Sequence, residues 1–202
     1  MQKTAPLTVN YGRALELAGQ HLPPPVSLRV PTRHGPVRIR IQRPTGSSTP
    51  PVYVHLHGGA FIMRHPRMDD FFARFLVSEA AVAVVSVDYD VAPQVRYPVA
   101  QEEVYDVAAF LAERGRELDL DGSRLALGVA EAYADKQPTG SPMLTPAILD
   151  LVRATYFRDV ARRHGVVVRH RVVPRADHYF LTPENATAEM GLIARVLRSH
   201  LT

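Results

Sequence analysis

The clearest pattern along the chain is a set of short apolar runs that alternate with segments of helical spacing. Val52–Leu56 and Ala81–Val87 are short and rich in β-branched residues, which is typical of strands buried inside a parallel sheet. Asp69–Ala80 and Val99–Arg114 place apolar residues three and four positions apart, as one face of a helix requires. Strands that alternate with helices in this order predict βαβ units and an α/β fold.

Two stretches before this alternation have other patterns. Thr8–Gly19 has helical spacing and is followed by Pro23–Pro25, so we expect a peripheral helix that ends before the prolines. Val26–Val30 and Val37–Ile41 flank a turn sequence, and apolar residues alternate with arginines in the second run. This alternation predicts an antiparallel hairpin with one face in solvent.

The alternation weakens in the second half of the chain. Arg124–Leu127 is a weak candidate for a further strand, and the turn-like pair Asp121-Gly122 precedes it. Beyond a polar and turn-rich stretch, we expect a helix at Thr145–Arg163, a strand at Val166–Val173 and an amphipathic helix at Ala186–Leu201.

Composition narrows the class of protein. A chain of 202 residues is long enough for one domain with a sizeable core, so we expect a single domain over residues 1–202. The hydrophobic share of 46% and charged share of 22% are close to globular averages. No window approaches the roughly 18 consecutive apolar residues of a membrane span, and the start has no apolar core of signal-peptide length. We expect a soluble protein with no membrane span, cytoplasmic by default.

Charge and cysteine content exclude other classes. The net charge of +4 comes almost entirely from arginines spread along the chain without a basic run, so nucleic acid is not an expected partner. The chain has no cysteine, which excludes disulfides and thiolate metal sites. We expect no metal and no cofactor.

The first candidate site follows the apolar run that ends at Leu56. The segment His55–Phe61 contains the adjacent glycines Gly58 and Gly59, which allow the backbone to bend so that its N–H groups point into a cavity. Such donors can stabilise an oxyanion that develops during a reaction. The alternative, an ordinary glycine turn at a strand end, becomes weaker because His57 and an apolar run precede the glycines.

The second candidate follows the next apolar run. Val87–Pro93 contains an Asp-Tyr pair, Asp88 and Tyr89, and an Ala-Pro pair, and Tyr97-Pro98 follows. The prolines would fix the path of the chain to the next helix, while Asp88 and Tyr89 would cross the top of the sheet and support the glycine loop. An ordinary strand-to-helix loop is the alternative.

In their order and spacing, the two segments resemble the His-Gly-Gly and Asp-Tyr-x-x-Ala-Pro motifs of the hormone-sensitive-lipase family of esterases. The resemblance implies an α/β-hydrolase fold, with a mostly parallel central sheet flanked by helices, and carboxylic ester hydrolysis. It also implies that the backbone N–H groups of Gly58, Gly59 and Ala60 form the oxyanion hole. His57, Asp88 and Tyr89 would then be structural supports of that loop.

A third segment matches the position of the family's catalytic histidine. Arg175–Phe180 follows the last apolar run and precedes the final helix, and it contains His178. By the resemblance, His178 would accept the proton of the nucleophile and return it to the leaving alcohol, a role that the near-neutral pKa of histidine suits. Tyr179 stands where the family usually has glycine, which could crowd this loop.

The nucleophile of the family is missing from the sequence. The fold places a serine in a Gly-x-Ser-x-Gly elbow directly after its fifth strand. No such motif occurs in the chain, and if Gly128 opened the elbow, Ala130 would occupy the nucleophile position. Ser141 is a poor replacement because a proline follows it and the second glycine is absent. We assign no nucleophile and no triad acid.

Compared with the family pattern that it resembles, the sequence is shortened at two places, near residues 128–131 and near 157–159. By family analogy, residues 1–25 correspond to a remnant of the N-terminal cap and residues 26–202 to the core. Removing central strands would leave their neighbours with unpaired backbone groups. Three explanations stay open: residues missing from the sequence, a degraded esterase, or a partner chain that completes the sheet.

The sequence therefore supports one leading function and two alternatives. The leading one is hydrolysis of short or medium acyl esters, with a small-molecule ester as substrate and a homo-oligomer left open. The second is a non-catalytic relative that binds a small molecule or serves as an assembly subunit. The third is an unrelated α/β domain with a chance Gly-Gly turn, which the order of the three motifs argues against.

Overall fold

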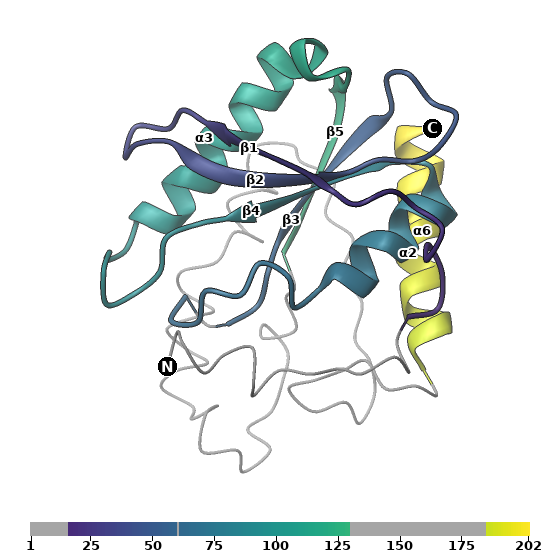
Figure 1. The fold of residues 1–202 in the computed structure, drawn as a ribbon, viewed down its shortest axis with the longest axis horizontal. Helices are drawn as coiled ribbons and strands as arrows, with labels where there is room; N and C mark the ends of the chain where they lie inside the picture. Colours follow the sequence, from purple (N-terminus) through teal and green to yellow (C-terminus); the bar gives the residue numbers. More distant parts are fainter. Residues whose placement is uncertain (1–15, 60, 130–184) are drawn as a thin grey trace. The chain divides into compact units, whose positions relative to one another are not determined.

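A computed structural model describes residues 16–59, 61–129 and 185–202 (Figure 1). All of these residues belong to one unit of the chain, which comprises residues 1–130 and 183–202. Residues 131–182 form the second unit, and they lie outside the described residues together with the helix expected at Thr145–Arg163 and the strand expected at Val166–Val173. The expectation of a single domain stays a prediction.

The described residues contain a five-stranded sheet. In chain order the strands are β1 (Val26–Val30), β2 (Val37–Gln42), β3 (Pro51–Leu56), β4 (Ala83–Asp88) and β5 (Asp121–Val129). Their order across the sheet is β1-β2-β4-β3-β5. Strand β2 pairs antiparallel with both β1 and β4, whereas β3 pairs parallel with both β4 and β5. Four of the five strands therefore run in one direction, which confirms the predicted mostly parallel sheet.

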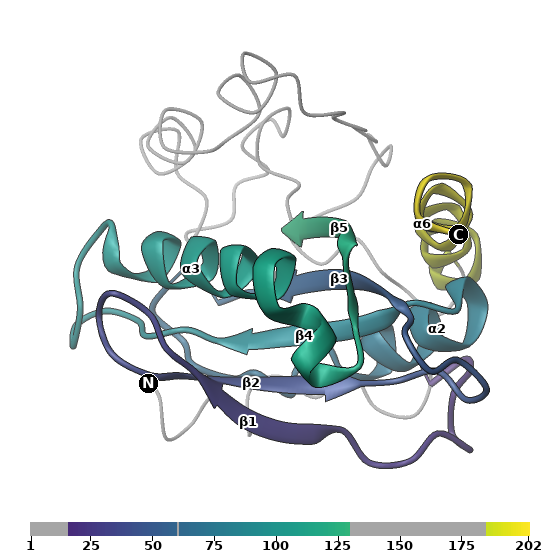
Figure 2. The same ribbon diagram turned by 90° about the horizontal axis from the view of Figure 1, so that it is seen from above.

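Helices cover both faces of this sheet (Figures 1 and 2). They are α2 (Asp70–Ala80), α3 (Val99–Arg114) with the short 3₁₀ helix η2 (Gly115–Leu118) after it, and α6 (Ala186–Leu201). Helix α3 lies on one face, while α2 and α6 lie side by side on the other (Figure 2). No described helix combines the length and the apolarity that crossing a bilayer requires.

The alternation of side chains along β3 explains the two faces. Val52, Val54 and Leu56 are buried in the apolar core that also contains Val104, Val107 and Leu111 of α3. Tyr53 and His55 point to the other face, because successive residues of a strand point to opposite faces. On that face, the ring centroids of Tyr53 and His55 lie 6.5 Å and 5.5 Å, respectively, from the ring centroid of Phe72 in α2.

The α2 face of the sheet is more polar than the sequence pattern predicted. We expected the arginines of β2 to lie in solvent, and Arg38 is indeed exposed, but Arg40 is buried. Its guanidinium donates hydrogen bonds of 2.6 and 2.9 Å to the two carboxylate oxygens of Asp70, in the first turn of α2. The prediction that this face lies fully in solvent was therefore wrong. Arg40 can be buried because its bidentate pair with Asp70 compensates the charge.

Two element boundaries differ from the prediction for local reasons. Ala81 has a left-handed backbone with φ of 54° and ends α2, so β4 begins at Ala83 rather than at Ala81. Asp121 pairs with Pro51, and its amide donates a 3.0 Å hydrogen bond to the Pro50 carbonyl, so β5 begins at Asp121 instead of after it. The turn-like character of Asp121-Gly122 appears as a register shift of the ladder between β3 and β5.

The segment before β1 also differs from the prediction. Residues 16–19, the described end of the expected N-terminal helix, are not helical. Gly19 has φ of 80° and lies so close to α2 that a Cβ there would be 2.7 Å from the Arg74 carbonyl oxygen. A left-handed residue in that position ends any helix that precedes it.

Candidate active site

The loop that follows β3 makes a tight turn at the carboxyl end of the strand. Gly59 has φ of 123°, and the amides of Ile62 and Met63 both donate to its carbonyl oxygen, at 2.9 and 3.0 Å. A Cβ on Gly59 would lie 2.6 Å from the Met63 carbonyl oxygen. Both the backbone angle and the close approach therefore require glycine at position 59.

Neither of these constraints applies to Gly58. Its φ is not in the left-handed region, and a Cβ there would make only ordinary contacts with the end of the Met68 side chain, at 3.6 Å. Between the described residues, neither the Gly58 amide nor the Gly59 amide donates a backbone hydrogen bond. As far as the described residues show, the turn thus leaves two adjacent backbone donors without a backbone acceptor at the end of a buried strand.

His57 is fixed by Tyr89 of the loop after β4. The two rings stack with centroids 4.4 Å apart and planes 7° apart, and the Tyr89 hydroxyl donates a hydrogen bond to the His57 carbonyl oxygen. The His57 Nδ1 lies 2.6 Å from the Gly58 carbonyl oxygen, while its buried Nε2 has no hydrogen-bond partner. Burial lowers the pKa of His57 below 6.5, so this imidazole is neutral at physiological pH.

Arg64 ties the same two loops together by charge. Its Nε donates a 2.6 Å hydrogen bond to the Asp88 carboxylate, and its two terminal nitrogens reach the Asp88 carbonyl oxygen at 3.1 Å and the Asp90 carboxylate at 2.7 Å. A backbone bond of 2.8 Å from the Ala92 amide to the Phe61 carbonyl oxygen adds a further tie. The glycine loop is therefore attached to the loop after β4 at several points.

A buried carboxyl group binds the loop after β4. Glu103 of α3 is 1% exposed and accepts a 2.8 Å hydrogen bond from the Asp90 amide. Burial raises the pKa of Glu103, and the Asp90 amide and the Arg64 guanidinium act in the opposite direction. The helix α3 thereby fixes the position of the loop after β4.

A second buried histidine lies in β3. His55 is 3% exposed, and its Nε2 lies 2.9 Å from a carboxylate oxygen of Asp69, the residue before α2. This pair joins the strand to the helix that follows the glycine loop. In the part of the chain that the structure describes, no group of three or more His, Asp or Glu side chains is arranged to hold a metal ion.

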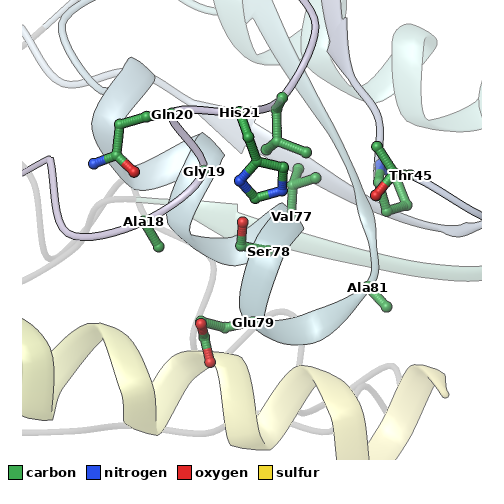
Figure 3. Close-up of a pocket in the computed structure, with 11 residues that line it drawn as sticks. Ala18, Gly19, Gln20, His21, Thr45, Val77, Ser78, Glu79 and Ala81 are labelled. Atoms are coloured by element: carbon green, nitrogen blue, oxygen red, sulfur yellow. The ribbon is translucent and has the colours of Figure 1, made fainter.

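A pocket of about 430 Å³ lies near the amino end of β3 (Figure 3). The turn around His21, the loop around Thr45 and the last turn of α2 around Ser78 line it, and the imidazole of His21 and the hydroxyl of Ser78 point into it. Thr45 precedes the amino end of β3, whereas Gly58 follows its carboxyl end. The pocket is therefore separate from the glycine loop.

The structure brings together five of the residues selected from the sequence, namely His57, Gly58, Gly59, Asp88 and Tyr89. Ala60, His178 and the elbow position Ala130 lie outside the described residues.

Sequence reasoning missed Arg64, Asp90 and Glu103. A signal for the first two was present, because a cation and two carboxylates occur in loops that end parallel neighbouring strands. The signal for Glu103 was absent, because a glutamate in a helix is usually exposed.

Comparison with known proteins agrees with this geometry. The family model described as "alpha/beta hydrolase fold" matches residues 53–132. That span includes most of β3, the glycine loop, β4 and β5. The chain has the α/β-hydrolase fold.

Its relatives by sequence are esterases, which confirms the resemblance to the hormone-sensitive-lipase type. Acetyl esterases of Salmonella paratyphi B and Salmonella enteritidis PT4 are each 30% identical over 139 residues. The matched region is 69% of this chain but only 39% of each acetyl esterase. The chain thus spans about two fifths of the length of these relatives.

Solved structures point to the same fold. An esterase from Pyrobaculum calidifontis is 27% identical with a TM-score of 0.55, over 82% of this chain and 47% of that one. The esterase LipW from Mycobacterium marinum is 18% identical with a TM-score of 0.72, over 98% of this chain and 88% of that one. At that level of identity LipW supports the fold alone.

Proposed function

We propose that this α/β-hydrolase protein is a carboxylic ester hydrolase that acts on short or medium acyl esters. The observation that carries the proposal is the glycine turn after β3, which leaves the amides of Gly58 and Gly59 without a backbone acceptor between described residues. Fixed N–H groups of this kind stabilise the oxyanion of a tetrahedral intermediate because they need no reorganisation during the reaction. The acetyl esterases to which the chain is similar support the class of substrate.

In the proposed reaction a serine hydroxyl attacks the ester carbonyl carbon while His178 accepts its proton. The carbonyl oxygen becomes an oxyanion held by the amides of Gly58, Gly59 and Ala60. As the tetrahedral intermediate collapses, His178 returns the proton to the leaving alcohol, and water then cleaves the acyl-enzyme by the same route. The serine is absent from the 202-residue sequence, so the 202-residue chain alone is expected to be nearly inactive.

The supports of the loop have a defined part in this proposal. Tyr89 holds the carbonyl group of His57 and stacks on its ring, so the peptide that leads into Gly58 has a fixed orientation. The His57 ring is neutral because of its burial, and it places no positive charge that would attract the substrate carbonyl oxygen away from the amides. We therefore assign His57, Asp88 and Tyr89 to support and not to proton transfer.

The second candidate function is a non-catalytic relative that binds a small molecule or serves as an assembly subunit. The observation that favours it is the residue pattern after β5, where Ala130 occupies the expected position of the nucleophile. In that case the glycine loop would bind a ligand oxygen without breaking a bond. A cytoplasmic location and a homo-oligomer are compatible with either function and stay predictions.

Hydrolysis of p-nitrophenyl acetate and butyrate by the protein expressed from its natural gene tests the proposal. Saturable hydrolysis is expected, and His178→Ala should remove nearly all of it, because the general base is lost. The intact mass of the same preparation shows whether the assayed protein is longer than the 202-residue chain. A mass above 22.4 kDa together with activity supports the ester hydrolase. No hydrolysis above the His178→Ala level in a protein of 22.4 kDa favours the non-catalytic relative.

A further inference from the structure

We propose that Arg64 is a positioning residue that holds the oxyanion amides of the glycine loop in place, an inference that rests on the proposed function. Arg64 lies five residues after Gly59 and joins this loop to the loop that follows β4. It does not touch the reacting atoms in the proposed reaction. Its role is to fix the loop that carries them.

The contacts of Arg64 form a fork that matches its guanidinium. Three nitrogens of one side chain reach three acceptors, namely the Asp88 carboxylate, the Asp88 carbonyl oxygen and the Asp90 carboxylate. The planar guanidinium presents its donors in a rigid arrangement, so these bonds fix the orientation as well as the distance. A lysine has one ammonium group at the end of a flexible stem and cannot reach all three acceptors in this geometry.

Burial decides which contact matters most. The Asp88 side chain is 9% exposed, whereas that of Asp90 is 43% exposed. The Arg64 side chain itself is 39% exposed, so the difference lies in the carboxylates: an exposed carboxylate gains little from an ion pair, while removal of Arg64 leaves the buried Asp88 carboxylate without its cation. The Asp88 contact should therefore carry most of the effect of Arg64, and the Asp90 contact should be a minor addition.

The neighbouring charges make this cation more important. Asp88, Asp90 and Glu103 place three carboxyl groups around Arg64, and Glu103 is already buried. Without Arg64, the loop after β4 would keep these groups with no described cation between them, and repulsion would push the loop apart. Tyr89 lies in the same loop and contacts His57, so this movement would reach the residue next to Gly58.

The loop also needs external support because its backbone is strained. Phe61 has φ of 56°, a left-handed conformation that is unfavourable for a bulky residue. Such a conformation persists only when surrounding contacts fix it. The bond from the Ala92 amide to the Phe61 carbonyl oxygen is one such contact, and the Arg64 side chain adds further bonds between the same two loops.

The experiment compares Arg64→Ala and Arg64→Lys with Arg67→Ala in the protein expressed from its natural gene. Arg67 is an exposed arginine of the same loop, so its variant controls for a lost positive charge. The first readout is kcat and KM for p-nitrophenyl acetate, with and without added methylguanidinium. The second is the ¹H–¹⁵N NMR signals of the Gly58 and Gly59 amides, which requires no activity.

For Arg64→Ala, kcat should fall roughly 10- to 100-fold with KM changed less than about threefold, because misplaced donors affect the transition state more than binding. Arg64→Lys should regain little, methylguanidinium should restore part of the loss, and Arg67→Ala should match the wild type. The Gly58 and Gly59 signals should shift or broaden in both Arg64 variants and not in Arg67→Ala.

Unchanged Gly58 and Gly59 signals in Arg64→Lys, or an unchanged kcat in Arg64→Ala, would overturn the inference. If the wild type does not hydrolyse esters, the proposed function fails, and the NMR signals alone decide whether Arg64 positions the loop. If Arg64→Ala does not fold, Arg64→Lys supplies both readouts. Each failure is therefore distinguishable from the other.

Discussion

At the scale of single residues, the loop combines a neutral buried ring with a glycine whose backbone angle other residues rarely adopt. His57 is buried against Tyr89, and its Nε2 has no partner among the described residues, so loss of hydration disfavours a proton on this ring more than the nearby Asp69 and Asp88 carboxylates favour it. Gly59 combines a φ of 123° with a contact that leaves no room for a Cβ. Neither feature was visible in the sequence, where both residues were only members of a motif.

The neutral ring predicts a pH dependence of stability. The pKa of His57 is lowered below 6.5 in the folded protein, so the unfolded chain binds a proton that the folded chain does not. Stability from this group is full above pH 6.5 and is lost as the pH falls from 6.5 toward the lower folded pKa. His57→Phe keeps a ring on Tyr89 but cannot titrate, so its stability should fall less on acidification.

Urea midpoints at about pH 7.5 and about pH 5.5 measure this difference. His21→Phe serves as the control, because His21 is an exposed histidine. The wild type and His21→Phe should lose stability over this range by similar amounts, and His57→Phe should lose less. An equal loss in all three proteins would mean that His57 is not the titrating group.

At the scale of elements, the sequence predicted most of the strands and helices but not their polar contacts. The apolar run at β3 and the helical spacing of α3 are strong local patterns, and α3 begins and ends where expected. The polar face of β2 was misread because burial of Arg40 depends on Asp70, 30 residues away. Patterns of local spacing carry no information about a partner at that distance.

For the candidate site too, local patterns in the sequence did not reveal contacts between distant residues. The motifs predicted which loops meet, since parallel strands bring their carboxyl ends to one edge of the sheet. They did not predict the means of attachment, because the Arg64 contacts join residues 24 and 26 positions apart. The described end of the expected N-terminal helix, residues 16–19, is not helical for a related reason, since the fit of Gly19 against Arg74 is a tertiary contact.

The pairing of β3 with β5 supplies a prediction at this scale. A Cβ on Gly128 would lie 1.6 Å from the hydroxyl oxygen of Tyr53 and 2.2 Å from its ring. Tyr53 is a buried side chain that cannot move away freely. Gly128→Ala should therefore lower the free energy of unfolding by about 2 kcal/mol or more.

A double-mutant cycle separates this clash from the strand propensity of alanine. In a Tyr53→Ala background the clash is gone, so Gly128→Ala should cost less than about 0.5 kcal/mol. Chemical denaturation of the four proteins measures the difference. Equal costs of Gly128→Ala in both backgrounds would show that Tyr53 does not occupy the space above Gly128.

At the scale of the whole molecule, the described residues form the part of an α/β-hydrolase fold that contains the glycine loop, for which we propose the oxyanion role. Strand β5 is the last of the five strands across the described sheet and ends at Val129, where the resemblance to the esterase family implies a nucleophile elbow. The chain corresponds to 39% of the acetyl esterases that it matches. The expected excisions near residues 128–131 and 157–159 stay predictions.

The motifs selected from the sequence fall in both units of the chain, and only those in the described unit can be compared with the structure. The motifs at residues 57–59 and 88–93 fall in the described unit, where contacts now explain them. The segment with His178 falls in the other unit, and its role still rests on the resemblance. The sequence lacks the expected serine, and no sequence pattern identified another residue as the nucleophile.

The hydrolysis of p-nitrophenyl acetate by Gly59→Ala tests the central claim most directly. The matched control is Gly35→Ala, because Gly35 has a similar φ of 113° but a Cβ there would meet nothing within 4 Å. In the protein expressed from its natural gene, kcat should fall about 100-fold or more in Gly59→Ala, as loss of an oxyanion donor does, and less than about threefold in Gly35→Ala. Equal kcat values in Gly59→Ala and the wild type would contradict an oxyanion site at this loop.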